Sequence, residues 1–484
     1  MYIALSPSYS IRNEEDTSFL IKVEKIIDVD QKSFGAFCIP PFMGYILAHI
    51  GDQKYPESIL SISAALNVSP NAIKNFVEQL IENPESKNFK ISETLSVILP
   101  SKLLIKSSQI PVPNVNEEKN FDRFAPYTVK RPSVPLYANL MVTTDCTTDC
   151  LYCYADRTLR PSLKTDKIIG IIKELSDQGT INLTLTGGDI FAHKDWHIIL
   201  KHVRQYGYKP FLSTKTPLTL EQIQWLRSLG YEELQFSLDS SSIAVLERLI
   251  KVKEDYLDKV TSFLRNCSEL GLNVLIRSVL TKHNASKNML EKLYTYLTQF
   301  KCIKEWVMIP AFFSKYKQHY YKSLEVSNDD LIYAYELKKR DNLAFKVGVS
   351  KISEKGYVLK RFECTEDYVC RNQICMANTT CLSILANGDC SICEMLYGDP
   401  AYILGNVNLS TIREIWNSPK ALGLYTMQQK EFPLSSPCRT CSVFDKCRNE
   451  FGKRVCYLDI SKSGHTQWDP DPRCPNSEDV NLIL

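Results

Sequence analysis

The chain has 484 residues, of which 44% are hydrophobic and 23% charged, a balance typical of folded globular proteins. A formal net charge of +3 without blocks of like charge gives no reason to expect nucleic-acid binding. Acidic residues near the N-terminus do not suit a signal peptide, and no apolar run reaches the ~18 residues that cross a membrane. We therefore expect a cytosolic protein of roughly two to four domains with no membrane partner.

Residues 1–105 predict a small winged-helix domain, in which a β-hairpin precedes three helices. In the clearest helix, Ser69 suits the cap and Pro70 the first position. Its apolar stripe consists of Ile73, Phe76, Val77, Leu80 and Ile81. Such a domain can bind DNA, or it can bind a peptide through an edge strand. We favour a peptide because no helix concentrates Lys and Arg.

A linker is predicted at residues 106–135, which are rich in Pro and polar residues and show no sustained period. From there to residue 345, strand-like segments alternate with amphipathic helical ones. Six such units and no pattern for a seventh or eighth strand predict an α/β fold with a partial (β/α)6 barrel. Ligands of such a barrel gather at the carboxyl ends of its strands. Residues 346–484 are rich in cysteine, short segments and turns, which is typical of a domain organised by metal.

Three cysteines, Cys146, Cys150 and Cys153, follow the first barrel strand in "TTDCTTDCLYCYADR". Three thiolates on a four-iron four-sulfur cluster would leave one iron free to bind a small molecule. The alternatives are a zinc site with a distant fourth ligand, or three reduced cysteines in the core.

Small and polar residues stand at the ends of the other predicted strands. Gly187 and Gly188 would let backbone approach a ligand, and the Asp189 carboxylate can accept from an ammonium group. The candidates on the later strands are Ser213, Ser237, Asp239, Arg277 and Ile309. Ser and Asp at strand ends are also common helix caps, and core packing explains Ile309 equally well.

The C-x3-C-x2-C spacing, together with "TGGD", resembles the radical S-adenosylmethionine (SAM) superfamily. This resemblance implies that the unique iron chelates the amino and carboxylate groups of SAM, with Tyr152 near the adenine. It also places the glycines and Asp189 near the methionine amino group, the later polar residues near the ribose and carboxylate, and Ile309 in a wall beside the adenine. Asp189 stands where the family usually has Glu, and its reach is one methylene shorter. Reduction of the cluster would generate a 5′-deoxyadenosyl radical, which can take hydrogen from an unactivated C–H bond.

The later cysteines resemble the SPASM extension of peptide-modifying radical SAM enzymes, which ligates two auxiliary four-iron four-sulfur clusters. The resemblance implies three clusters in all. The outer auxiliary set would be Cys438, Cys441, Cys447 and Cys474. The inner set would be Cys375, Cys393 and Cys456, with Cys370 or Cys364 available as a fourth ligand. Eight residues separate Cys447 from Cys456 where the family usually has three, and a zinc ribbon on Cys438 and Cys441 is the alternative.

Two further expectations concern single residues. Glu394 directly follows Cys393, where related enzymes that oxidise a side chain place a carboxylate base, although an exposed Glu is more often simply solvated. Cys38, Cys267 and Cys302 stand apart from the clusters and are expected in the core.

With an N-terminal domain that resembles the PqqD-like leader-binding type, the whole chain resembles maturases of ribosomally made peptides. "LTGGDIFAH" is similar to the same stretch in sactipeptide thioether maturases. The resemblance implies a precursor peptide whose leader binds residues 1–105, an external electron donor such as flavodoxin or ferredoxin, and Cys sulfur-to-carbon thioether products. An open inner cluster would suit binding of the substrate thiol. The alternatives are C–C or C–O crosslinks, side-chain oxidation, or a non-catalytic iron–sulfur scaffold that binds peptide or transfers electrons.

Overall fold

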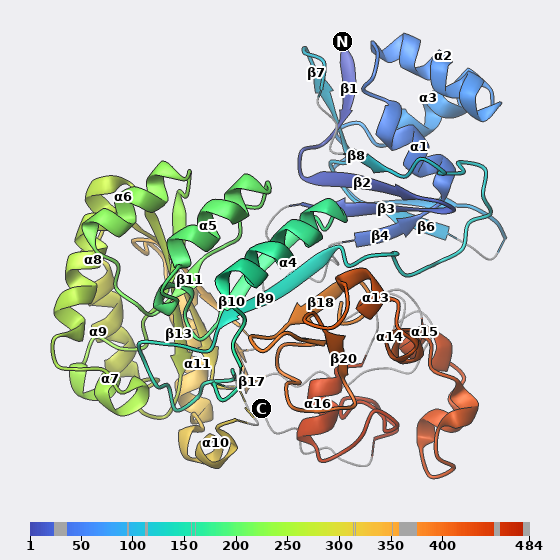
Figure 1. Cartoon of the computed structure of the whole chain (residues 1–484). Coiled ribbons are helices and arrows are strands. Elements are labelled where there is room, and N and C mark those ends of the chain that lie inside the picture. Colours follow the sequence, from blue (N-terminus) through green and yellow to red (C-terminus); the bar gives the residue numbers. More distant parts are fainter. Residues whose placement is uncertain are drawn as a thin grey trace. The chain divides into compact units, whose positions relative to one another are not determined.

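The chain forms two compact units, one that includes Met1–Ser133 and another that includes Val134–Arg448 (Figure 1). The computed structural model describes residues 1–23, 36–93, 96–111, 115–155, 157–159, 161–312, 314, 316–350, 352–357, 375–449 and 455–477. No helix within these described ranges is long and apolar enough to cross a membrane.

The first unit contains the predicted hairpin and three helices. The hairpin strands are β2 (Tyr9–Glu14) and β3 (Thr17–Lys22), and the helices are α1 (Pro41–His49), α2 (Tyr55–Leu66) and α3 (Pro70–Glu78). The other strands are β1 (Tyr2–Leu5), β4 (Ala36–Ile39), β5 (Lys87–Lys90), β6 (Ser96–Leu99), β7 (Leu104–Ser107) and β8 (Val115–Glu117). One sheet has the order β4-β3-β2-β8, and the β5–β6 hairpin follows α3.

Helix α3 begins as the sequence predicts and ends earlier. The Ser69 hydroxyl accepts from the Ala72 N–H at 3.3 Å, which confirms the cap. Ile73 and Val77 are buried in the core of the first unit. Because the helix stops at Glu78, the last two residues of the predicted stripe lie beyond it.

The segment expected to be a linker packs on the first unit up to Ser133. Strand β8 pairs in parallel with β2, and the Tyr127 hydroxyl donates to the carbonyl of Cys38 on β4 at 3.0 Å. These contacts join residues about ninety to a hundred positions apart, so no local period in the sequence could reveal them.

The second unit contains all six predicted barrel strands. They are β9 (Tyr137–Thr143), β10 (Asn182–Gly187), β11 (Ser213–Thr214), β12 (Glu233–Ser237), β13 (Asn273–Leu280) and β14 (Ile303–Pro310). The pairs β10–β9, β11–β12, β12–β13 and β13–β14 are parallel, and a further strand that was not predicted, β15 (Lys346–Val349), adds in parallel to β14. Within the described residues no ladder joins β10 to β11, so the strands form an open, partial barrel.

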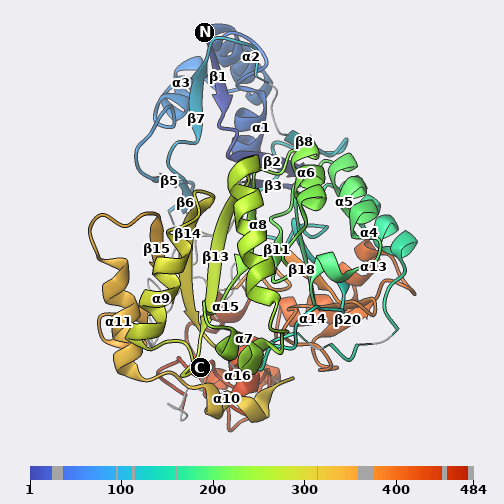
Figure 2. The ribbon, with the colours of Figure 1, turned by 90° about the vertical axis from the view of Figure 1, so that its left-hand side faces the viewer.

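Helices separate the barrel strands and cover their outer face. They are α4 (Thr165–Asp177), α5 (Trp196–Gln205), α6 (Leu220–Ser228), α7 (Ile243–Ile250), α8 (Tyr256–Leu270), α9 (Lys287–Leu297), α10 (Gln318–Leu324) and α11 (Asn328–Lys338). Helix α8 packs on β13 (Figure 2). Along β13, Val274, Ile276 and Leu280 are fully buried, whereas the alternate residues are less buried and belong to the opposite, inner face.

The C-terminal region extends the sheet of the first barrel strand. Its elements include β16 (Ile352–Ser353), β17 (Gly356–Tyr357), β18 (Cys381–Ile384), β19 (Asp389–Ser391), β20 (Ile403–Asn406), α13 (Ile412–Trp416), α14 (Pro419–Tyr425), α15 (Phe444–Arg448) and α16 (Tyr457–Lys462). Strand β18 pairs in parallel with β9, which gives one sheet of order β10-β9-β18-β19-β20. The cysteine-rich region is therefore hydrogen-bonded to the strand that leads into the cysteine loop.

Two glycines allow the end of β10 to lie against the cysteine loop. Gly187 has φ +144°, and a Cβ there would lie 2.3 Å from the Thr143 carbonyl oxygen. A Cβ on Gly188 would lie 2.0 Å from the Asp145 carbonyl oxygen. The Gly188 N–H also donates to the Thr143 carbonyl at 2.9 Å. Backbone of the cysteine loop thus fills the space that side chains at these positions would need.

Replacing Gly188 by Ala should destabilise the second unit by about 1–3 kcal/mol, because the new methyl group would overlap a backbone carbonyl. Gly170→Ala in α4 is the matched control, since its Cβ would meet nothing within 4 Å. That change should stabilise the helix by about 0.5–1 kcal/mol. Denaturant unfolding of both variants beside the parent measures the two shifts, and a Gly188→Ala protein as stable as the parent would contradict this packing.

Candidate functional site

The loop after β9 brings together the three predicted cluster ligands. The Thr148 hydroxyl lies 3.4 Å from Cys146 Sγ and 3.5 Å from Cys150 Sγ. Burial raises the pKa of the Cys153 thiol, and the nearby Cys146 thiol raises it further. Backbone N–H groups of the loop donate to carbonyls at the end of α7, which fixes the loop on the barrel.

The environment of these thiols fits a bound cation. None of the three cysteines forms a disulfide. Burial raises the pKa of the Cys150 thiol to about 12, against the opposing effect of Lys215. A thiol of this kind ionises when a metal replaces its proton. Cys146, Cys150 and Cys153 therefore fit a four-iron four-sulfur cluster held by three thiolates.

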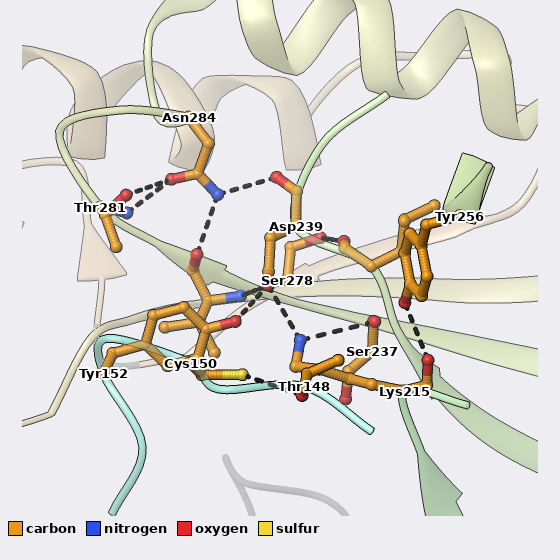
Figure 3. Close-up of polar contacts among 12 residues, drawn as sticks. Thr148, Cys150, Tyr152, Lys215, Ser237, Asp239, Tyr256, Ser278, Thr281 and Asn284 are labelled. Atoms are coloured by element: carbon orange, nitrogen blue, oxygen red, sulfur yellow. Dashed lines mark hydrogen bonds and ion pairs between the residues drawn. The ribbon is translucent and has the colours of Figure 1, made fainter. Parts of the chain in front are cut away.

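A buried polar network lies beside this loop (Figure 3). Lys215 Nζ donates to Asp239 Oδ2 at 2.9 Å, and the Tyr152 hydroxyl donates to the same oxygen. The Val279 N–H donates to Asp239 Oδ1 at 2.8 Å. Both carboxylate oxygens are thus already bound within the protein, and the expected contacts of Asp239 with ribose and Tyr152 with adenine stay predictions. Sequence reasoning missed Lys215, whose only signal was its place directly after the strand-end "LST".

Asp189 also has internal partners. Its Oδ2 accepts from the Thr214 hydroxyl at 2.6 Å, the Lys215 N–H at 3.0 Å and the Thr216 hydroxyl at 2.9 Å. Its Oδ1 accepts from the Phe191 N–H at 3.0 Å. The carboxylate therefore braces the loop after β11. Its predicted contact with the SAM amino group would add to these bonds.

The remaining candidates share the inner face of the second barrel sheet. By strand register these are Ser213, Ser237, Arg277 and Ile309. The Ser213 hydroxyl donates to Gln235 Oε1 at 3.0 Å, and Gln235 Nε2 donates to the Ser237 hydroxyl at 2.8 Å. Arg277 forms an ion pair with Glu305 at 3.0 Å. Gln235 and Glu305 were missed in the sequence, although buried apolar residues flank Gln235 and buried Trp306 follows Glu305.

Glu394 lies between the cysteine loop and the C-terminal cysteines. Its Oε1 is 3.5 Å from the hydroxyl of Tyr154, the residue after Cys153. Its Oε2 is buried and has no hydrogen-bond partner among the described residues. Burial raises the pKa of the Glu394 carboxyl, and the hydroxyls of Thr186 and Tyr154 partly oppose the rise. A buried carboxyl with a raised pKa and an unused oxygen suits an acid–base role.

The inner auxiliary set is grouped as expected and includes one more thiol. The Cys375 thiol lies close enough to Cys393 and Cys456 to affect their pKa values, after the larger effect of burial. Burial raises the pKa of Cys381, followed by the nearby Glu394, Cys375 and Cys393. Sequence reasoning missed Cys381, whose signal was its place between Cys375 and Cys393. Cys370 and Cys364 lie outside the described residues.

The outer auxiliary set also comes together. Burial raises the pKa of the Cys447 thiol to about 12, and Cys438, Cys474 and Cys441 all lie near enough to raise it further. In the part of the chain that the structure describes, no three His, Cys, Asp or Glu side chains converge closely enough to hold a single metal ion. Ligands to different irons of one cluster need not converge on one point.

The cysteines expected in the core are buried there. Cys38, Cys267 and Cys302 expose between 0% and 8% of their surface. Cys390, which the sequence did not single out, is fully buried as well.

Two protein-family models match the regions that contain the cysteine loop and most of the auxiliary cysteines. The model of the Radical SAM superfamily matches residues 140–293. The SPASM model, an iron-sulfur cluster-binding domain, matches residues 375–442. The chain combines a radical SAM domain with a SPASM domain. These domains imply four-iron four-sulfur clusters and SAM.

Two solved structures of one protein have a similar fold. The chain is similar to SuiB of Streptococcus suis, in a crystal structure with the precursor peptide SuiA, at a TM-score of 0.63 and 14% identity. The match covers 98% of this chain and 100% of that one, which shows a common fold. SuiB bound to S-adenosylmethionine matches with a TM-score of 0.61 and 14% identity, over 98% of this chain and 99% of that one.

Curated relatives match over a shorter region. GTP 3′,8-cyclase of Aliarcobacter butzleri (strain RM4018) is 25% identical over 166 residues, 32% of this chain and 50% of that protein. PqqA peptide cyclase of Xanthomonas euvesicatoria pv. vesicatoria (strain 85-10) is 26% identical over 157 residues, 32% of this chain and 42% of that protein. The chain thus spans about half the length of the curated relatives it matches or less.

Three separate cysteine sets predict about twelve irons per chain after anaerobic reconstitution. Replacing Cys146, Cys150 and Cys153 together by Ala should remove about four irons and leave the spectra of the two auxiliary clusters. Cys267→Ala is the control, because this cysteine is buried in the core far from the three sets in sequence. Iron and zinc analysis of the parent tests the count, and zinc together with only about four irons would contradict the auxiliary clusters.

Proposed function

We propose that the protein is a radical SAM maturase that installs Cys sulfur-to-carbon thioether crosslinks in a ribosomally made precursor peptide. The observation that carries this proposal is the position of Glu394, which contacts Tyr154 of the cysteine loop and directly follows the auxiliary ligand Cys393. Similar proteins also involve peptides, since SuiB was crystallised with a precursor peptide and one relative is a PqqA peptide cyclase.

Forming the thioether removes one hydrogen atom, one proton and one electron from the peptide, and the proposed chemistry names an acceptor for each. Bound SAM would, on one-electron reduction, split into methionine and a 5′-deoxyadenosyl radical, which would take one hydrogen atom from a peptide carbon. The thiol proton of the substrate passes to the Glu394 carboxylate as sulfur bonds to that carbon. The one electron left over would be accepted by clusters held at the auxiliary cysteine sets, of which the inner one is adjacent to Glu394. An external donor such as flavodoxin or ferredoxin would supply the electron that cleaves SAM.

The N-terminal unit is proposed to hold the leader of the precursor within residues 1–105. Strand β4 is an edge of its sheet, and an extended peptide can add there through main-chain hydrogen bonds. The Tyr127 hydroxyl already donates a hydrogen bond to the Cys38 carbonyl on this strand. A leader that pairs along β4 would have to displace that contact.

A second candidate is a crosslink that does not use substrate sulfur, or oxidation of a side chain. It is favoured by Cys381, which lies near two ligands of the inner set and could complete four thiolates there. A cluster with four protein ligands would have no iron free for a substrate thiol. Mass spectrometry of a precursor whose Cys residues are replaced by Ala separates the two candidates, because only the second predicts continued modification.

Replacing Glu394 by Gln should lower peptide modification at least about a hundredfold while SAM cleavage continues, because general-base catalysis contributes about 10²–10⁴-fold. Exposed Glu431→Gln is the control and should behave as the parent. The assay compares the amounts of crosslinked peptide and of 5′-deoxyadenosine that are formed with a cysteine-bearing precursor peptide.

The same assay gives a pH dependence. Since burial raises the pKa of Glu394, the carboxylate form becomes populated only at a higher pH than for an exposed Glu. The ratio of product to 5′-deoxyadenosine should therefore rise with pH in the parent and stay low and flat in Glu394→Gln. An unchanged ratio in the variant would exclude Glu394 as the base.

A further inference from the structure

A fully buried arginine lies against the outer auxiliary cysteines. Arg448 follows Cys447 and is 1% exposed. Its Nη1 donates to the Gln467 carbonyl at 2.8 Å, and its Nη2 donates to the Asp469 carbonyl. Nη2 also lies 3.5 Å from Cys438 Sγ. The guanidinium is therefore fixed by backbone groups and aimed at a predicted cluster ligand.

An aromatic pocket holds the guanidinium in place. Its Cζ lies 5.2 Å from the ring centroid of Phe432. Phe444 and Trp468 meet Phe432 edge-on, with centroid separations of 4.9 and 5.2 Å. Cys438 and Cys441 pack against this aromatic cluster. Because Arg448 is buried, its charge interacts with neighbouring groups more strongly than it would at the surface.

No carboxylate among the described residues pairs with the charge of Arg448. None of the described Asp or Glu side chains forms an ion pair with it, and its buried Nε has no hydrogen-bond partner among the described residues. Burying an unpaired guanidinium is strongly unfavourable. The nearby groups that can carry negative charge are the thiols of Cys438 and Cys447 and the phenol of Tyr457. Thiolates bound to a cluster would supply the missing anion.

We propose that Arg448 is a positioning residue that raises the reduction potential of the outer auxiliary cluster. When such a cluster accepts an electron, its net charge becomes more negative by one. A fixed cation that donates to a ligand sulfur stabilises this reduced form more than the oxidised form. The proposal rests on the outer cysteines holding an iron–sulfur cluster and not on the identity of the peptide product.

Redox titration followed by electron paramagnetic resonance tests this proposal. The full chain with Cys146, Cys150 and Cys153 replaced by Ala serves as background, so that only auxiliary signals are titrated. The outer signal is assigned as the one lost in Cys438→Ala. In this background Arg448→Met should shift the outer midpoint to lower potential, whereas Arg448→Lys, which keeps the charge, should shift it less.

Arg439→Met is the matched control, because Arg439 lies between Cys438 and Cys441 but donates to the Phe432 carbonyl at 3.1 Å. It should leave the midpoint unchanged. An unchanged midpoint in Arg448→Met would overturn the proposal. If Arg448→Met loses the outer cluster, its retention in Arg448→Lys supports a role for the charge. Loss of the cluster from both variants overturns the proposal, because the shape of the arginine side chain would then be what matters. Neither SAM cleavage nor peptide product is measured, so failure here is distinct from failure of the proposed function.

Discussion

The parallel pairing of β18 with β9 determines the arrangement of the candidate site. Cys381 is in register with Tyr137, and Ile384 with Leu140, so backbone hydrogen bonds connect the auxiliary cysteines to the strand that enters the cysteine loop. This constraint allows Glu394 to meet Tyr154 across more than two hundred residues of sequence.

Different buried charged residues lie at each part of the site. Lys215 and Asp239 form an ion pair beside the cysteine loop, Glu394 lies between the two cysteine fields, and Arg448 lies at the outer set. Buried ionic groups cost free energy unless partners compensate them. Lys215 has its carboxylate within the protein, whereas Arg448 has none among the described residues and Glu394 retains an unused oxygen. A bound cluster could therefore supply the anion that Arg448 lacks, and a bound substrate could supply a hydrogen-bond donor to Glu394.

The sequence predicted those features that depend on local pattern. Alternation identified all six barrel strands, and cysteine spacing identified ligand sets that the structure groups together. Features that depend on distant contacts were not predictable in this way. The β18–β9 pairing, the packing of residues before Ser133 on the first unit and the internal partners of Asp189 and Asp239 all involve residues far apart in sequence. Cys381 was missed because it falls outside the family spacing.

The central claim is that the loop of Cys146, Cys150 and Cys153 holds a cluster that cleaves SAM reductively. The most direct measurement is the release of 5′-deoxyadenosine from SAM by the anaerobically reconstituted, chemically reduced full-length protein. The account predicts its formation by the parent and its absence when the three cysteines are replaced by Ala. Absence of 5′-deoxyadenosine from a parent protein whose clusters are shown to be present and reduced would contradict the account.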